Sequence, residues 1–427
     1  MTDPELKPDE SPVGGEMSRR RLLGLGASAG VSALAASTGL RAGPAAAGAL
    51  PDGATSTPAV RAQAASFEGP HQAAILSEPT AATAFVAFDI IGQDRADLRD
   101  LLRTVTMRMR RLYAGGLTEN LGPASPQDDN GVLGPAPPSR QVAFMLGFGE
   151  SLFDDRFGLA HQRPAKLTRM GTFPNDNLDP AQCHGDLSLQ ICADDMDTVL
   201  HALRDITKHT RGGMQPRWRI DGFQSPPRPA GTPRNLLGFK DGIANPATSD
   251  PREMESLVWV KAGAPEPEWT AGGSYLVARV IRMLVEFWDR VSLDEQETMF
   301  GRRKATGAPL DGNDEFDTPL YGANPQNTTI PLNAHIRLAN PRTPATASSR
   351  ILRRGYNYDR GIDLNGNLDQ GLLFTSYQQD IERQFVATQA RLIDEPLVDY
   401  ISPIGGGYFF CPAGLDGAGD YFGSTLV

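Results

Sequence analysis

Three segments of the C-terminal half contain the residue types that could carry chemistry. Asp241 lies between Gly238 and Gly242, so a tight turn should present its carboxylate. His335 lies in a short apolar segment, and Arg353 belongs to an arginine pair. A carboxylate, an imidazole and a guanidinium could together move a proton, ligate a metal and stabilise developing negative charge. Each also has a structural explanation, namely a turn-capping carboxylate, a hydrogen-bonded histidine and a surface cation, so these residues alone do not define a reaction.

The expected backbone decides which of these side chains can share a site. Residues 335–339 are predicted to be extended, which would place every second residue from His335 on one face. Consecutive residues of an extended segment point to opposite faces, so only one of Arg353 and Arg354 can enter a site. We expect Asp241, His335 and Arg353 to converge on one buried cofactor.

The remaining histidines and cysteines form no familiar metal or disulfide pattern. The chain has 6 His, and His201 and His209 are too far apart on one predicted helix to share a metal. The 3 Cys are too few for a disulfide framework, and two buried thiols at Cys183 and Cys192 are favoured over a bridge between them. A single axial histidine bound to haem iron would need no such cluster.

The composition is that of a soluble globular chain with room for two domains. Of the 427 residues, 40% are hydrophobic and 22% are charged, and the formal net charge is −10. This acidic balance argues against nucleic acid as a partner.

The N-terminal segment predicts export. Arginines 19–21 precede a weakly apolar run, and alanines 45–47 offer a small-residue cleavage site. Residues 1–47 are therefore predicted to be a twin-arginine signal peptide, followed by a disordered linker at 48–66. The twin-arginine export machinery should deliver the protein to the periplasm, the cell envelope or the exterior. A membrane anchor is the alternative, although the apolar run is short, and Met17 is an alternative start.

The order of the predicted elements favours an α+β protein with two ferredoxin-like domains and antiparallel sheets, at 67–225 and 226–427. In the first domain, apolar patterns predict strands at 81–91, 141–146, 186–192 and 218–220, and helices at 94–112 and 195–208. In the second domain, they predict strands at 274–285, 372–377 and 407–410, extended segments at 335–339 and 351–358, and helices at 292–301 and 380–392. A capping box at 292–295 should open the first of these two helices.

The turn around Asp241 belongs to the most specific motif of the chain. Residues 238–242 read Gly-Phe-Lys-Asp-Gly, which matches the Gly-x-x-Asp-Gly signature of the dye-decolorizing peroxidases. Other segments that match this family lie at 147–153, 183–186, 335–342, 352–356 and 404–410. The chain therefore resembles this family over residues 70–427, and within it the exported deferrochelatase/peroxidase branch associated with bacterial iron uptake.

This resemblance implies one haem b per chain, held mainly by the C-terminal domain. It implies that His335 is the proximal ligand of the iron, Asp241 the distal acid/base and Arg353 the distal arginine. The residues that should contact the porphyrin are Gly242, Ile243, Ala244, Asn340, Pro341 and Arg342, the last as a propionate partner. A second carboxylate should hold the ring of His335, and the candidates are Glu315 and Asp317.

The implied activity is that of a peroxidase, which uses hydrogen peroxide to oxidise dyes, phenols or other one-electron donors. Because a carboxylate accepts protons at lower pH than a histidine, an acidic optimum is expected. The alternatives are a deferrochelatase, which releases iron from haem and leaves the porphyrin intact, and a haem carrier without catalysis. An iron-permease system is a further partner implied by analogy, and the sequence leaves open whether the chain forms a homo-oligomer. Large dyes could be oxidised at surface aromatic residues, for which the candidates are Trp218, Trp259, Trp269, Trp288, Tyr356 and Tyr358, with core packing as the alternative for most of them.

Overall fold

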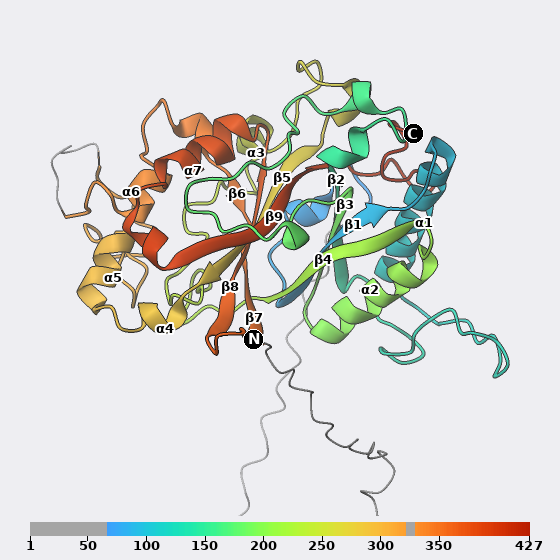
Figure 1. Ribbon diagram of the computed structural model, residues 1–427, viewed down its shortest axis with the longest axis horizontal. Helices are drawn as coiled ribbons and strands as arrows, with labels where there is room; N and C mark the ends of the chain where they lie inside the picture. Colours follow the sequence, from blue (N-terminus) through green and yellow to red (C-terminus); the bar gives the residue numbers. More distant parts are fainter. Residues whose placement is uncertain (1–65, 322–328) are drawn as a thin grey trace, which may run out of the picture. The chain divides into compact units, whose positions relative to one another are not determined.

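The computed structural model describes residues 66–321 and 329–427, and these residues belong to one compact unit (Figure 1). The elements of the N-terminal half are β1 (Ala82–Ile90), α1 (Arg95–Ala114), β2 (Val142–Gly149), β3 (Leu187–Ala193), α2 (Met196–His209) and β4 (Met214–Phe223). All pairings are antiparallel, and the strands lie in the order β4-β1-β3-β2. This is the predicted ferredoxin-like arrangement.

Polar caps and apolar faces explain the two long helices of this half. The side chain of Asp94 accepts hydrogen bonds from the N–H groups of Ala96 and Asp97, and that of Asp195 accepts one from Thr198. Both helices lie on the same side of the strands (Figure 1) and share one apolar core with them. The buried residues of this core include Leu98, Leu102 and Val105 of α1, Val199 and Ile206 of α2, and Val86 and Phe88 of β1.

The C-terminal half repeats this strand order. Its main strands are β5 (Ser274–Met283), β7 (Tyr356–Ile362), β8 (Leu368–Gln378) and β9 (Ile401–Cys411), in the antiparallel order β9-β5-β8-β7. The other elements are α3 (Pro251–Leu257), α4 (Val285–Trp288), α5 (Leu293–Phe300), α6 (His335–Ala339), β6 (Leu352–Arg353) and α7 (Ala387–Arg391). As predicted, Ser292 caps α5 by accepting from the N–H of Glu295, and Gly301 ends it in a left-handed conformation.

The two halves share one sheet whose ends meet. β2 pairs with β9 at Phe148 and Phe410, and β4 pairs with β7 at Phe223 and Asn357. Because β5 also pairs with both β8 and β9, every strand except β6 belongs to a closed ring. The side chains that fill this ring include Phe85, Met145, Leu276, Tyr356, Tyr377 and Phe409. The two ferredoxin-like halves are therefore confirmed, whereas the pairing between their edges was not predicted.

The prediction of an extended segment at 335–339 is wrong. These residues form the short helix α6, in which the N–H groups of Arg337 and Leu338 donate to the carbonyl of Ala334 at 3.0 and 3.1 Å. A helix of 5 residues is too short to show helical periodicity, which explains the error. His335 therefore stands at the start of a helix and shares no strand face with the residues that follow.

Other elements differ from prediction only in detail. The helix predicted at 380–392 begins with a π-helical turn, Glu382–Val386, before α7 continues it. The segment at 351–358 is divided between β6 and β7. The cysteines are free and buried, which confirms separate thiols at Cys183 and Cys192.

The predictions for the N-terminus fall on residues that the structure does not describe. The signal peptide at 1–47 and the linker at 48–66 lie outside the described residues, with the exception of Ser66. Over the described ranges, no helix is long and apolar enough to cross a membrane.

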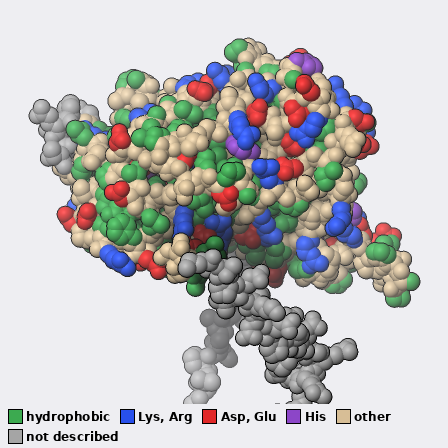
Figure 2. Space-filling model, in the orientation of Figure 1, with side chains coloured by type: hydrophobic (Ala, Val, Ile, Leu, Met, Phe, Trp, Pro, Cys, Tyr) green, Lys and Arg blue, Asp and Glu red, His purple; other side chains and the backbone are tan. Residues whose placement is uncertain are grey.

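The visible surface is not uniform. Figure 2 shows charges of both signs interspersed over the N-terminal half, and hydrophobic side chains gathered over α4 and α5. The exposed hydrophobic residues of this region include Leu284, Phe287 and Leu293.

Replacement of Phe409 by Ala tests whether the filled ring stabilises the fold. Phe409 is fully buried inside the ring and packs on Phe85, with ring centroids 6.0 Å apart. The cavity left by Phe409→Ala should lower the free energy of unfolding by about 3 to 5 kcal/mol. Phe316→Ala, at an exposed position, is the matched control and should change it by less than about 0.5 kcal/mol. Urea unfolding measures both, and equal effects would contradict a packed interior.

Candidate active site

One cavity in the C-terminal half is lined by Asp241, His335 and Arg353 together. Asp241 lies on the loop between β4 and α3, His335 is the first residue of α6, and Arg353 ends β6. Arg354 does not line this cavity, and its guanidinium donates to the carbonyl of Ser77. The expected convergence is therefore observed, and one member of the arginine pair enters the site.

The loop before Asp241 is held by its own backbone and by one asparagine. The Asn235 side chain accepts from the N–H groups of Leu237 and Phe239, at 3.1 and 3.2 Å. The N–H of Asp241 donates to the carbonyl of Pro233 at 2.9 Å. These bonds fix the position from which the Asp241 side chain extends.

Two glycines make this loop possible. Gly238 and Gly242 have φ angles of 86° and 97°, a left-handed region that favours glycine. A Cβ atom at position 238 would also lie 2.5 Å from Cε of Lys304. Both glycines of the motif are therefore favoured by conformation, and at Gly238 a side chain would also displace Lys304.

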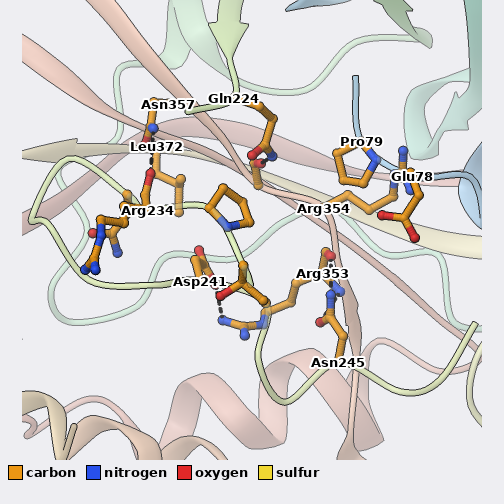
Figure 3. Close-up of a pocket in the computed structure, with 15 residues that line it drawn as sticks. Glu78, Pro79, Gln224, Arg234, Asp241, Asn245, Arg353, Arg354, Asn357 and Leu372 are labelled. Atoms are coloured by element: carbon orange, nitrogen blue, oxygen red, sulfur yellow. Dashed lines mark hydrogen bonds and ion pairs between the residues drawn. The ribbon is translucent and has the colours of Figure 1, made fainter. Parts of the chain in front are cut away.

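Asp241 and Arg353 form an ion pair at the wall of the cavity. Nη1 of Arg353 lies 2.9 Å from Oδ1 of Asp241 (Figure 3), and their side chains are 28% and 24% exposed. Partial exposure keeps both groups reachable by small molecules, whereas a fully buried pair would be inert. The pair could accept a proton on the carboxylate while the guanidinium stabilises negative charge.

His335 is held by Glu395 rather than by either predicted carboxylate. Nδ1 of His335 lies 2.6 Å from Oε2 of Glu395, which is 3% exposed. A carboxylate accepts, so Nδ1 carries the proton and Nε2 is left to bind a metal. Burial lowers the pKa of His335, but the charge and hydrogen bond of Glu395 oppose it and the net shift is upward.

The two predicted partners of His335 are therefore wrong. Glu315 instead pairs with Lys240 and accepts from Thr232, and Asp317 accepts from backbone N–H groups of its own loop. Glu315 and Asp317 lie 20 and 18 residues before His335. Glu395 lies 60 residues after His335, where no spacing rule applies.

Most of the predicted porphyrin contacts do line the cavity. Its wall includes Gly242, Ile243, Ala244, Asn340 and Arg342. Pro341 is absent from the described lining, so the structure does not bring it to the cavity wall.

Two neighbouring arginines, Arg302 and Arg342, line the cavity together with Tyr321, and of these three the sequence pointed only to Arg342. Arg302 is 5% exposed and donates to the carbonyls of Gly307 and Glu315, at 2.7 and 2.9 Å. Burial lowers the pKa of Arg302, and burial raises the pKa of Tyr321, whose hydroxyl has no hydrogen-bond partner among the described residues.

These features can be tested against the haem that the family resemblance implies. The remaining wall is largely apolar and includes Ile281, Met283, Phe300, Phe374 and Leu397. A flat apolar ring with a central metal and charged carboxylates needs an apolar slot, a free imidazole nitrogen and cations at one end. The cavity supplies an apolar wall, the free nitrogen of His335 and the neighbouring cations Arg302 and Arg342, so its residues fit a haem.

A second cavity borders the ion pair from another side. Besides Asp241 and Arg353 it is lined by Gln224 and Asn357, and by the exposed residue Glu78 (Figure 3). The ion pair therefore lines both the larger cavity and a smaller one. Protons or small polar molecules can approach Asp241 through such surroundings.

The predicted surface oxidation residues are not at the surface. Each is less than 9% exposed: Trp218, Trp259, Trp269, Trp288, Tyr356 and Tyr358. The structure supports the alternative, core packing, for all of them.

Comparisons with known proteins agree with this geometry. The families described as Dyp-type peroxidase, N-terminal and Dyp-type peroxidase, C-terminal match residues 72–224 and 232–416. A protein of Escherichia coli strain K12 called Deferrochelatase is 48% identical over 427 residues, which covers 98% of this chain and 99% of the relative. A protein of the same name from Shigella flexneri is 48% identical over 425 residues, again covering 98% of this chain and 99% of the relative.

Solved structures show the same fold. The DyP-type peroxidase from Cellulomonas bogoriensis is 38% identical, with a TM-score of 0.74, over 85% of this chain and 98% of that one. An oxyferrous complex of DtpA from Streptomyces lividans is 36% identical, with a TM-score of 0.76, over 85% of this chain and 97% of that one. On these matches, which cover both halves of the described structure, the chain belongs to the Dyp-type peroxidase family.

Proposed function

We propose that this chain is a haem b peroxidase, with one haem per chain, that uses hydrogen peroxide to oxidise dyes, phenols or other one-electron donors. The observation that carries the proposal is the pairing of Asp241 with Arg353 in the same cavity as the His335–Glu395 pair. Haem retention alone would need only the second pair. The Asp241–Arg353 pair supplies a proton acceptor and a cation, which peroxide chemistry requires in addition to haem binding.

The residues around the cavity would hold the haem in a fixed orientation. Nε2 of His335 would ligate the iron, since Glu395 keeps the proton on Nδ1. Arg302, Arg342 and the hydroxyl of Tyr321 would hold the propionates. When bound, the haem supplies an iron that takes electrons from the donor and passes them to peroxide.

Asp241 and Arg353 would divide the work on peroxide. The carboxylate of Asp241 accepts the proton from one peroxide oxygen and returns it to the other, so that the O–O bond breaks with water as the leaving group. The guanidinium of Arg353 stays cationic and stabilises the negative charge that develops on the departing oxygen. The ion pair of 2.9 Å holds the two groups side by side for this step.

Deferrochelation is the second candidate function, and the relatives favour it. Proteins called Deferrochelatase match 98% of this chain at 48% identity. In this reaction, two protons would replace the iron on the pyrrole nitrogens, and the porphyrin would remain intact. A haem carrier without catalysis is disfavoured, because the Asp241–Arg353 pair has no role in binding alone.

We also propose export through the twin-arginine machinery to the periplasm, the cell envelope or the exterior. The support is the run of arginines at 19–21 and the alanines at 45–47. An iron-permease system and a second copy of the chain remain predictions.

Asp241→Asn tests the proton transfer. The amide cannot accept the proton, so the rate constant with peroxide should fall at least about 100-fold, while haem content stays unchanged. The parent protein should be most active at acidic pH. Stopped-flow absorption spectroscopy measures the rate, and Asp221→Asn is the matched control because Asp221 pairs with Arg219 outside the cavity. An Asp241→Asn protein that reacts as fast as the parent would refute the assigned role.

Anaerobic incubation with haem separates the two candidate functions. A deferrochelatase should release protoporphyrin, detected by its fluorescence, together with an equal amount of iron captured by a chelator. His335→Ala, which lacks the ligand that fixes the iron, is the control for unspecific loss. If no porphyrin forms while peroxide is still consumed, the peroxidase alone is supported.

Intact-mass analysis of the protein recovered outside the cytoplasm tests export. Its N-terminus should begin close to residue 48, and replacement of arginines 19–21 by lysine should retain the precursor inside the cell. An exported protein that still carries residues 18–47 would show that the segment is not a cleaved signal.

A further inference from the structure

The backbone of Arg353 lies at an open edge of the sheet. β6 pairs with β8 along one edge, and the N–H of Arg354 donates to the carbonyl of Thr375 at 2.8 Å. Because successive residues of a strand direct their N–H and C=O groups to opposite edges, those of Arg353 point away from β8. No strand among the described residues pairs with β6 on that side.

The side chain of Asn245 takes the place of the missing strand. Its Nδ2 donates to the carbonyl of Arg353 at 2.8 Å, and its Oδ1 accepts from the N–H of Arg353 at 3.1 Å (Figure 3). A carboxamide can donate and accept at once, as a peptide group does, whereas a carboxylate accepts only. The N–H of Asn245 in turn donates to the carbonyl of Gly242 at 3.0 Å.

The same turn therefore holds Arg353 at two points. Asp241 pairs with its guanidinium, and Asn245 fixes its backbone. Among the described residues, Asp241 is the only partner of the guanidinium. An arginine side chain can adopt many rotamers. Among the described residues, only the ion pair with Asp241 restrains the position of this guanidinium.

We infer that Asn245 is a positioning residue that keeps Arg353 in place while Asp241 changes charge. This inference rests on the proposed function. When the Asp241 carboxylate takes up a proton from peroxide, its attraction for the guanidinium falls. The bonds from Asn245 involve uncharged groups, so they persist through that step and keep the backbone from which the guanidinium extends in a fixed place. A displacement of about 1 Å at such a point can cost about 100-fold in rate.

A double-mutant cycle with Arg353 distinguishes positioning from a general structural role. Asn245→Ala should slow the reaction with peroxide about 10- to 100-fold in the parent protein and cause no further loss in Arg353→Ala. Asn130→Ala is the matched control, because Asn130 also donates to one backbone carbonyl and accepts from one backbone N–H, outside both cavities. It should leave the rate unchanged in both backgrounds.

Fluoride binding to the haem-loaded ferric protein gives a readout that does not depend on turnover. A correctly placed guanidinium stabilises a bound anion. Asn245→Ala should therefore lower the affinity for fluoride about 10- to 100-fold, and only when Arg353 is present. Asn245→Ser serves in the same cycle if Asn245→Ala does not fold, as judged by thermal unfolding. Equal losses with and without Arg353, or an unchanged fluoride affinity, would overturn the inference. A parent protein that binds haem but does not react with peroxide would instead reject the proposed function, and the fluoride cycle would still test Asn245.

Discussion

The closed ring of strands is the constraint on which the rest of the structure depends. β5 is hydrogen-bonded to β8 on one edge and to β9 on the other, so its register is fixed twice. Leu276 and Val280 fill the ring, while Ile281 and Met283 line the cavity. Since neighbouring residues of a strand face opposite sides, a slip by one residue would exchange core and cavity wall together. Packing of the ring therefore also shapes the site.

Local patterns predicted the elements, whereas contacts between distant segments remained hidden. The capping box at Ser292 and the apolar spacing of the long helices indicated where helices form, and the structure adds Asp94 and Asp195 as caps. Closure of the ring depends on short pairings such as Phe148 with Phe410, for which no periodicity exists. Helix α6 was missed because a single turn has no repeat to recognise.

The same division holds for the site. Asp241 was identifiable because glycines at 238 and 242, which readily adopt positive φ, indicate a tight turn that presents its carboxylate. Glu395 and Arg302 carry no such mark, since each becomes meaningful only when the fold brings it to His335 or to the cavity. The family motifs pointed to His335 as the proposed iron ligand and to Asp241 and Arg353 as the proposed distal pair, and the structure shows the groups that hold these side chains.

Burial explains why two ion pairs near the cavity have different consequences. Arg279 and Asp176 are 2% and 1% exposed, and their pairing joins β5 to a loop of the N-terminal half. Such a pair is costly to separate, which suits a fixed contact between the halves. Asp241 and Arg353 are about a quarter exposed and stand between two cavities, so the carboxylate can exchange protons without opening the core.

The groups that would hold the haem iron and those that would act on peroxide form two separate sets of contacts, although they alternate along the chain. His335 and Glu395 form one pair, and Asp241, Asn245 and Arg353 form one connected set. No hydrogen bond among the described residues links the pair to the set. Charge still couples them, because Arg353 lowers and Asp241 raises the pKa of His335. Loss of the distal set should remove peroxide chemistry and leave the hydrogen bond that holds His335.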